Sequence, residues 1–433
     1  MRPTTPDATS APTADAAPAR TPRLASGWTR RLAGLGPAFL VLAVALAASA
    51  TSLGNGFAFD DRWIIQFNGR VHGIGRWAEI FRESYWPVLS NGLYRPLVSV
   101  GYALQWTLGK GSPAPFHAVN VIMYAGACLA FWRLALRVLP EWAALAAAAL
   151  FAAHPVHVEA TGNVVGQAEL ACTMLLCAAA SLYIGWRNDG RLASDARAPG
   201  WPRVLALALL YAGATLYKEQ GIVLIALLAA AELTVVADER APRVRLAAVR
   251  PVYLTMLLVA VLLLVVRWRV LGQLSGDVPI SVLEGLSMPE RTVGMLGLVP
   301  ELVRLLLWPA ALSADYGPRH VTFVPAWTAA AVVGLVIVLG VVAFAVRARR
   351  VQRAIAFGVA WLAVTWAPVS NVLIPSGILL AERTLFAPSA GVVLAVAGLI
   401  AWAARREDMR ELPPRTVRLL AAMLVLVVAA GTV

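Results

Sequence analysis

Alternating polar and apolar segments of about ten residues, the signature of a transmembrane β-barrel, are absent from this chain of 433 residues. No unit of about 20–50 residues repeats, and no stretch is typical of a separate soluble domain. Cysteine is scarce, and Cys128, Cys172 and Cys177 all fall inside apolar segments. That placement excludes a disulfide framework and a metal-ligand pattern, so we expect three small packing residues. Lysine occurs only as Lys110 and Lys218.

Long apolar runs are what the sequence has instead. Hydrophobic residues make up 59% of the chain and charged residues 14%. Runs such as 37–53, 249–266 and 385–404 approach the roughly 20 residues that cross a hydrocarbon core of about 30 Å. The first run is too long for the core of a cleavable signal peptide, and aromatic and acidic residues follow it, so it predicts a membrane anchor. The fold class that we expect is all-α integral membrane.

The runs predict about eleven crossings in one polytopic membrane domain, residues 37–433, after a disordered cytoplasmic tail, residues 1–36. Two further apolar stretches, 93–109 and 292–312, contain backbone breaks and charges. We expect them to be juxtamembrane or re-entrant helices on the outer side. The predicted crossings are 37–54, 116–138, 142–153, 168–186, 202–217, 220–237, 249–271, 326–346, 354–371, 384–404 and 416–433.

The net charge of +13 is divided unevenly by this topology. With the N-terminus inside, the inner segments hold 24 of the 37 Lys and Arg residues and 11 of the 24 acids, so the whole excess lies inside. This positive-inside pattern argues against a nucleic-acid partner. We predict a multi-pass protein of the cell (inner) membrane with a cytoplasmic N-terminus and a non-cytoplasmic C-terminus. A long outer loop, 55–115, would hold helices lying in the plane of the lipid bilayer.

Two adjacent carboxylates, Asp60 and Asp61, stand at the outer mouth of the first crossing. Adjacent carboxylates repel, which can raise one pKa and make a better general base. They can also share a divalent metal, Mn²⁺ or Mg²⁺, through their oxygen atoms. A solvated turn that merely ends the helix is the alternative. We take both residues as candidate catalytic groups.

A His-Pro break follows a short apolar run. Residues 142–153 rise only about 18 Å at about 1.5 Å per residue, too little to cross the hydrocarbon core. His154, His157 and Glu159 therefore lie where irregular backbone must line a polar cavity or pack on protein. They could hold a phosphate or sugar, or ligate a metal, although His-X-X-His with an internal Pro is not a zinc-helix spacing. A satisfied helix cap is the alternative.

The remaining embedded polar groups fall on the same predicted side. Lys218 is a compact ammonium suited to a phosphate, and Glu219 is either its ion-pair partner or part of a site. Arg383 and, more weakly, Arg95 also suit a phosphate, with interface anchoring as the ordinary explanation. Acids for an acceptor and cations for an anionic donor favour a transferase. Two more candidates for the cavity wall are Glu382 and His117.

Eight short motifs occur in order along the chain: Phe59–Asp61, Tyr94–Leu97, Phe116–Asn120, Phe151–Ala160, Val165–Leu170, Lys218–Gly221, Pro309–Tyr316 and Ala381–Arg383. In this order they resemble the transmembrane O-mannosyltransferases that target cadherins, and their bacterial relatives, which are GT-C glycosyltransferases. The resemblance covers about residues 55–400. It implies a polyprenyl- or dolichyl-phosphate sugar donor, usually mannose, and an active site on the non-cytoplasmic face. Its eleven-crossing layout is similar to the one obtained from charge.

The sequence departs from that family in two respects. Gln167 stands where the family often has Arg, and the tetratricopeptide repeats that usually follow the membrane part are missing. We therefore expect either a fragment or an enzyme with a smaller acceptor.

The function we predict is an inverting glycosyltransferase that moves one sugar from a polyprenyl-phosphate carrier to an acceptor hydroxyl. The acceptor would be a protein Ser or Thr, or a cell-envelope glycan or lipid. Asp60 would be the general base, with Asp61 orienting it or helping to bind a divalent metal. Lys218, Arg383 and Arg95 would stabilise the leaving phosphate. Residues expected to shape the cavity are His154, His157, Glu159, Glu219, Glu382 and His117.

Two other functions use the same features. A transporter or flippase for a lipid-linked or anionic solute would use the cavity without chemistry, although the sequence lacks the inverted repeats typical of that class. A non-catalytic membrane scaffold is the other alternative.

Overall fold

The structure, a computed structural model, describes residues 27–87, 92–189, 200–274, 281–313, 316–317 and 320–406. These residues form helices, turns and loops with no strand among them, which confirms the all-α prediction. The main helices are α1 (Gly27–Ser49), α3 (Pro96–Gly109), α4 (Ala114–Val138), α5 (Glu141–Ala152), α7 (Gln167–Asp189), α8 (Trp201–Tyr217), α9 (Leu224–Thr234), α10 (Pro242–Leu271), α11 (Met288–Leu307), α12 (Ala329–Ala348), α13 (Arg353–Trp366) and α14 (Phe386–Arg406). Shorter ones are α2 (Trp77–Ile80) and α6 (Val158–Gly162).

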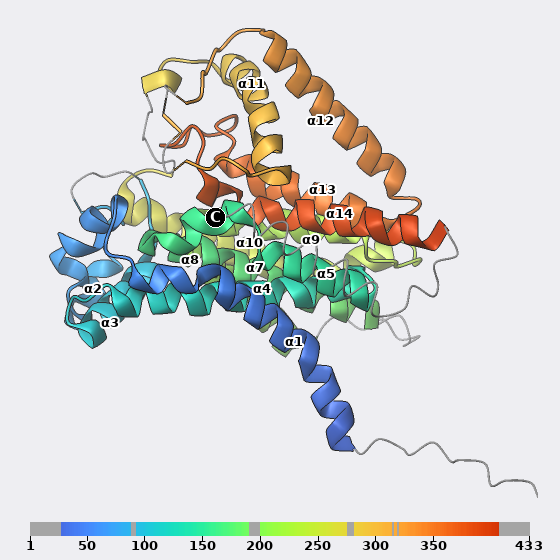
Figure 1. Cartoon of the computed structure of the whole chain (residues 1–433), viewed down its shortest axis with the longest axis horizontal. Helices are drawn as coiled ribbons and strands as arrows, with labels where there is room; N and C mark the ends of the chain where they lie inside the picture. The colour runs from blue at the N-terminus through green and yellow to red at the C-terminus, as the bar shows by residue number, and fades with distance from the viewer. Residues whose placement is uncertain are drawn as a thin grey trace, which may run out of the picture.

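Most of these helices lie side by side in one bundle (Figure 1). Within it α4 packs against α7, α7 against α8, and α13 against α14, while α5 also contacts α14. Helices α11 and α12 pack on each other and form an arm that leans away from the bundle (Figure 1). The contact of α5 with α14 brings the first half of the chain against the last described helix, so distant segments can share one site.

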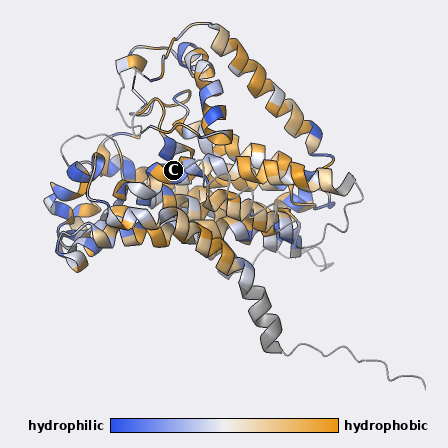
Figure 2. Cartoon of the chain, viewed as in Figure 1, coloured by the Kyte–Doolittle hydropathy of each residue, from blue (hydrophilic) through white to orange (hydrophobic). Residues whose placement is uncertain are grey.

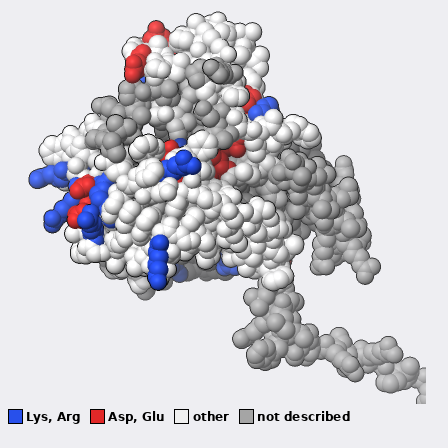
Figure 3. All heavy atoms as spheres, turned by 60° about the vertical axis from the view of Figure 1, so that its left-hand side comes forward, with Lys and Arg blue, Asp and Glu red and all other residues white. Residues whose placement is uncertain are grey.

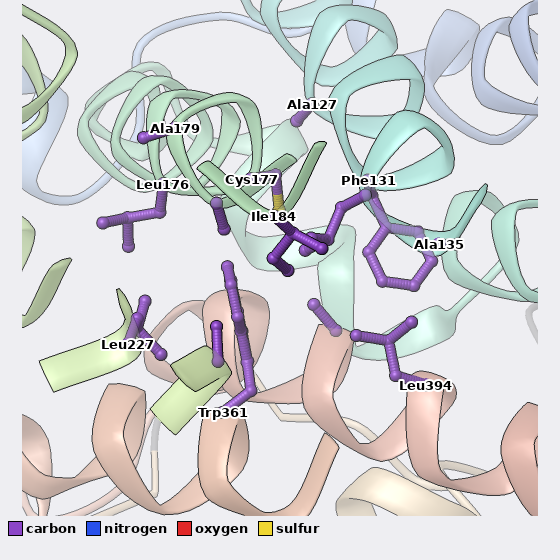
Figure 4. Close-up of a cluster of buried hydrophobic side chains, with 14 of the residues drawn as sticks. Ala127, Phe131, Ala135, Leu176, Cys177, Ala179, Ile184, Leu227, Trp361 and Leu394 are labelled. Carbon is purple, nitrogen blue, oxygen red and sulfur yellow. The ribbon is translucent and has the colours of Figure 1, made fainter. Parts of the chain in front are cut away.

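Apolar and small side chains fill the centre of the bundle. Phe131 of α4, Cys177 of α7, Trp361 of α13 and Leu394 of α14 belong to one buried cluster (Figure 4). All three cysteines of the chain are buried and free, which confirms the packing role predicted for them.

Two glycines allow α13 and α14 to touch. A Cβ on Gly358 would lie 2.5 Å from the carbonyl oxygen of Gly391, and a Cβ on Gly391 would lie 2.4 Å from that of Gly358. Without the hydrophobic drive that water supplies, helices in lipid associate by close packing, and small residues permit it. This contact positions the turn Glu382–Leu385, which leads into α14 and carries Arg383.

Six helices among the described residues are long and apolar enough to cross a membrane, and the bent pair of Glu141–Ala152 with Pro155–Gly162 would make a seventh. Apolar residues dominate these helices (Figure 2), the pattern of a multi-pass membrane protein. Helices also occupy three further predicted crossings as α8, α9 and α13. The count of eleven crossings stays a prediction, and 416–433 lies outside the described residues.

One boundary differs from the prediction, and the placement of two stretches is untested. Helix α1 begins at Gly27, so helical backbone starts inside the segment 1–36 predicted to be a tail, of which residues 1–26 lie outside the described part. The stretches 93–109 and 292–312 are largely helical, as α3 and α11, and neither is among the membrane-capable helices. Their juxtamembrane placement stays a prediction.

The stretch between α1 and α3 folds into short helices and turns, several of which pack on α3. Arg70 forms an ion pair with Glu83, and the ring of His72 stacks on Trp106 of α3 with ring centroids 3.7 Å apart. Over the face seen in Figure 3, charged side chains gather in a few clusters on an otherwise uncharged surface. A single π-helical turn, Arg62–Gln66, directly follows the two adjacent carboxylates.

Candidate active site

Hydrogen bonds of Asp61 connect the segment after α1 to the turn before α7. Its Oδ1 accepts a hydrogen bond from the amide of Val165 at 2.9 Å, and its Oδ2 accepts from the amides of Val164 at 3.2 Å and Ala58 at 3.3 Å. Burial raises the pKa of the Asp61 carboxyl above its ordinary value, although these three N–H groups act to lower it. The side chain is fully buried and lines none of the described cavities. Asp61 therefore positions its neighbour, Asp60.

Asp60 faces the turn that precedes α14. Its Oδ2 lies 3.1 Å from Nη1 of Arg383. The Nε of Arg383 lies 3.4 Å from Oε1 of Glu159, and the backbone amide of Arg383 donates to Oε2 of Glu159 at 2.9 Å. One guanidinium group thus bridges two carboxylates from different parts of the chain.

A cavity of about 520 Å³ adjoins this bridge, and we call it the first cavity. It brings together five of the predicted site residues and two that were not predicted. Among the described residues, four cations and three acids line it, so the formal charge of these groups is positive when all are ionised. They are Arg95, Lys218, Arg267 and Arg383, with Asp60, Glu169 and Glu219.

Every cation of the first cavity is paired with an acid. Lys218 forms an ion pair with Glu169, and both side chains are buried. Glu219 is bound instead by Arg95, with Nε 2.9 Å from its Oε2, and by Arg267, with Nη1 3.4 Å from its Oε1. The interpretation of Glu219 as the partner of Lys218 is therefore wrong. Packing of α7 on α8 brings Glu169, in the first turn of α7, to the end of α8 where Lys218 lies.

Glu219 links the loop before α3 to the turn after α8. Burial raises the pKa of Glu219, but the charges of Arg95 and Arg267 outweigh that effect and hold the pKa below its ordinary value. Glu219 also accepts a hydrogen bond from the amide of Tyr94 at 2.9 Å. Arg95 in turn lies over the ring of Tyr85, 5.1 Å from its centroid, so the guanidinium is held on two sides.

The remainder of the first cavity is largely apolar. Ala260, Leu263 and Leu264 of α10 contribute to its wall, together with Ile222 and Ile374. A largely apolar wall that also carries cations is suited to a ligand that has a hydrocarbon chain and an anionic headgroup.

The two histidines of the His-Pro turn lie in packing positions. Nε2 of His154 lies 3.0 Å from the carbonyl oxygen of Leu306. Nδ1 of His157 lies 3.1 Å from the hydroxyl of Tyr124, and its Nε2 lies 2.8 Å from Oγ of Ser389. Neither histidine lines a described cavity. The prediction that both shape the cavity is therefore wrong for the described cavities. Their ring nitrogens instead form hydrogen bonds that connect the turn to α4, α11 and α14.

The other two predicted wall residues have different surroundings. His117 is buried and lines no described cavity, and its Nδ1 has no hydrogen-bond partner among the described residues. Glu382 accepts a hydrogen bond from the hydroxyl of Tyr316 at 2.6 Å. Together with Glu159 it lines a separate cavity of about 490 Å³, which we call the second cavity.

Sequence reasoning missed Glu169 and Arg267 as site residues. The available signal was a charged residue within an otherwise apolar helix, because such residues usually face a cavity or a partner. Gln167, which stands where the resembled family often has Arg, lies outside the first cavity. It exchanges hydrogen bonds of 2.8 and 3.0 Å with Gln105.

The carboxylate pair does not fit the predicted divalent-metal site. Both oxygens of Asp61 accept backbone hydrogen bonds, and one oxygen of Asp60 contacts Arg383. No group of three or more His, Cys, Asp or Glu in the described part of the chain could hold a metal ion. We therefore derive no chemical step through a metal.

Fold and site together define a helical membrane protein with a carboxylate and paired cations in a largely apolar cavity. The chain is similar to proteins named protein O-mannosyl-transferase. It is 38% identical to Tmtc2 of Drosophila melanogaster over 181 residues, 40% of this chain and 19% of that protein. It is 28% identical to TMTC3 of Mus musculus over 390 residues, 83% of this chain and 41% of that protein. It is 26% identical to F38B6.6 of Caenorhabditis elegans over 378 residues, 84% of this chain and 51% of that protein.

These similarities bear out the predicted resemblance to the protein O-mannosyl-transferases. No protein-family model matches it. The chain spans about half of the length of these relatives or less.

Proposed function

We propose that this protein is a membrane glycosyltransferase that transfers one mannose from a polyprenyl-phosphate carrier to the hydroxyl of a protein Ser or Thr. The transfer takes place at the non-cytoplasmic face of the membrane. Kinship with proteins named protein O-mannosyl-transferases supports the sugar and the protein acceptor. The form of the first cavity supports the lipid-linked donor.

The observation that carries this proposal is the position of Asp60 beside paired cations in a largely apolar cavity. The apolar wall takes the polyprenyl chain, and the cations take its phosphate. Burial strengthens such charge interactions, because little water remains to screen them. Four cations suffice for a phosphate even though each has an acid partner, because the cavity retains a net positive charge.

The chemistry follows from the same groups. The acceptor oxygen attacks the anomeric carbon as its proton passes to the Asp60 carboxylate. The bond from that carbon to the phosphate oxygen breaks, and its electron pair leaves with the polyprenyl phosphate. Lys218 and Arg383 stabilise the growing negative charge on the leaving phosphate, so that group needs no proton. Attack from the side opposite the leaving group inverts the anomeric configuration.

Radiolabelled polyprenyl-phosphate mannose and a Ser/Thr-rich acceptor peptide test the proposal with the purified protein in lipid nanodiscs. We expect label to appear in the peptide, with inverted anomeric configuration. A well-folded protein that binds the donor and moves it between leaflets without transferring sugar would be a flippase instead. The Asp60→Asn variant serves as the control for non-enzymatic transfer.

A further inference from the structure

The second cavity lies on the far side of the Asp60–Arg383–Glu159 bridge. Asp60 and Arg383 line the first cavity, whereas Glu159 lines the second. Two adjacent residues also line different cavities: Phe59 lines the second cavity, and Asp60 lines the first. The candidate base therefore stands at the boundary between two cavities of similar size, about 520 and 490 Å³.

The charges of the second cavity differ from those of the first. Among the described residues, those with a charge that line it are Glu159 and Glu382, and no described Lys or Arg lines it. A phosphate would be repelled there, because it would meet two carboxylates and no cation. The lipid-linked donor thus fits the first cavity alone, which leaves the second for a neutral or basic molecule.

Part of the wall of the second cavity is formed by a loop. Residues 55–58 have no regular secondary structure, and all four line the cavity. The amides of Gly56 and Phe57 donate to no atom of the described residues, whereas their carbonyl oxygens contact His117 and Arg62. The two amides can donate hydrogen bonds to backbone carbonyl oxygens of a peptide, which binds it largely independently of its side chains.

Phe59 combines a strained backbone conformation with an exposed aromatic side chain. Its φ is +44°, in the left-handed region, where a residue with a Cβ is strained by about 1–2 kcal/mol. Its side chain is 63% exposed although it is large and apolar. Strain of this kind persists where the surrounding structure imposes it, and it is concentrated at binding and catalytic sites. Here it leaves an aromatic ring exposed beside Asp60.

We propose that the second cavity binds the acceptor as a polypeptide segment that accepts hydrogen bonds from the amides of Gly56 and Phe57 and lies against Phe59, with its Ser or Thr hydroxyl presented to Asp60. This inference rests on the proposed function, because it names the binding place of that reaction's acceptor. It also sets a charge preference: segments with Lys or Arg near the hydroxyl bind better than segments with Asp or Glu.

Val158 offers a test that leaves the first cavity intact. It lines the second cavity only, and it is 51% exposed, as is Val332 on α12, which lines none of the described cavities. We would measure donor binding without peptide, and the acceptor KM for a synthetic peptide of alternating Thr and Val. Val158→Trp should raise the acceptor KM by about tenfold or more while donor affinity stays within about twofold. Val332→Trp should change neither, and an unchanged acceptor KM in Val158→Trp would overturn the inference.

A second measurement keeps the inference separate from the proposed function. Val158→Cys preserves side-chain size, and the three native cysteines are buried, so a benzophenone maleimide labels the new thiol selectively. Illumination should crosslink the Thr/Val peptide to Val158→Cys and not to Val332→Cys. Crosslinking without sugar transfer would support the peptide site and contradict the proposed transferase activity. Sugar transfer without crosslinking would support the transferase activity and contradict the peptide site. Equal crosslinking by Lys-flanked and Glu-flanked peptides would reject the charge preference.

Discussion

Asp60 and Arg383 are 323 positions apart in the sequence, yet Oδ2 of Asp60 lies 3.1 Å from Nη1 of Arg383. The residue proposed as the base is therefore held by a residue proposed to bind the donor phosphate. A donor phosphate that contacts Arg383 competes with Asp60 for the guanidinium and weakens the Asp60–Arg383 ion pair. In the proposed reaction, donor binding thus makes the carboxylate more available to the acceptor proton.

Asp60→Asn and Asp61→Asn should fail in different ways. Asp60→Asn keeps the shape of the side chain but cannot take a proton, so transfer should fall by about 10²–10⁴-fold with little loss of thermal stability. Asp61→Asn should also unfold at a lower temperature, because its amide NH₂ would face backbone donors that now face a carboxylate oxygen. Transfer rates and unfolding temperatures measured side by side check this. Wild-type transfer by Asp60→Asn would exclude it as the base.

Lys218 should matter to both stability and donor binding. Lys218→Met leaves Glu169 as an unpaired buried carboxylate, which typically costs about 3–5 kcal/mol. Adding Glu169→Gln removes that charge and should restore the unfolding temperature. The donor KM should stay raised in the double variant, because the cation is still missing. Recovery of both quantities together would mean that the pair is only structural.

Arg267 and Arg269 form a matched pair on α10. Arg267 lines the first cavity and contacts Glu219, whereas Arg269 is exposed and lies over the ring of Trp268. Arg267→Ala should weaken donor binding by about tenfold or more, since it removes one of four cavity cations. Arg269→Ala should bind the donor as the native chain does. Equal donor affinities in the two variants would remove Arg267 from the site.

Glu219 should make stability depend on pH in the acid range. Its pKa is lowered in the folded protein, so its contribution is fully present above the ordinary value of 4.5 and is lost as the pH falls through the lowered value. Glu219→Gln should be less stable than wild type at neutral pH and should lose less stability on acidification. Unfolding temperatures across this range measure the effect, with exposed Glu79→Gln as the control. Parallel curves for Glu219→Gln and wild type would contradict the prediction.

Topology can be checked with single introduced cysteines, because the native three are buried. Glu79 lies in the predicted outer loop and Arg349 in a predicted inner one, and both are exposed. In intact cells, an impermeant maleimide should label Glu79→Cys and leave Arg349→Cys unlabelled until the cells are opened. Labelling of Arg349→Cys from outside would reverse the faces assigned to the bundle.

Much of the helical layout could be predicted from the sequence, because the length of an apolar run depends only on local composition. The runs at 116–138, 249–271 and 384–404 appear as α4, α10 and α14. Interruptions of the apolar runs were also informative, since the His-Pro and Lys-Glu pairs mark the end of a run from local sequence alone. Such signals place Asp60, Lys218 and Arg383 in turns, and the first cavity contains all three.

The sequence by itself therefore determined which segments are helices and which polar residues lie at their ends. Only the tertiary structure decided which of these residues meet. Lys218 forms an ion pair with Glu169, whereas Glu219 pairs with two arginines. The two ring nitrogens of His157 form hydrogen bonds with Tyr124 and Ser389. The reason is physical: partner choice depends on the rotation and crossing of packed helices, set by close contacts such as Gly358 on Gly391. Those contacts join segments far apart in the chain, and no local pattern in the sequence records them.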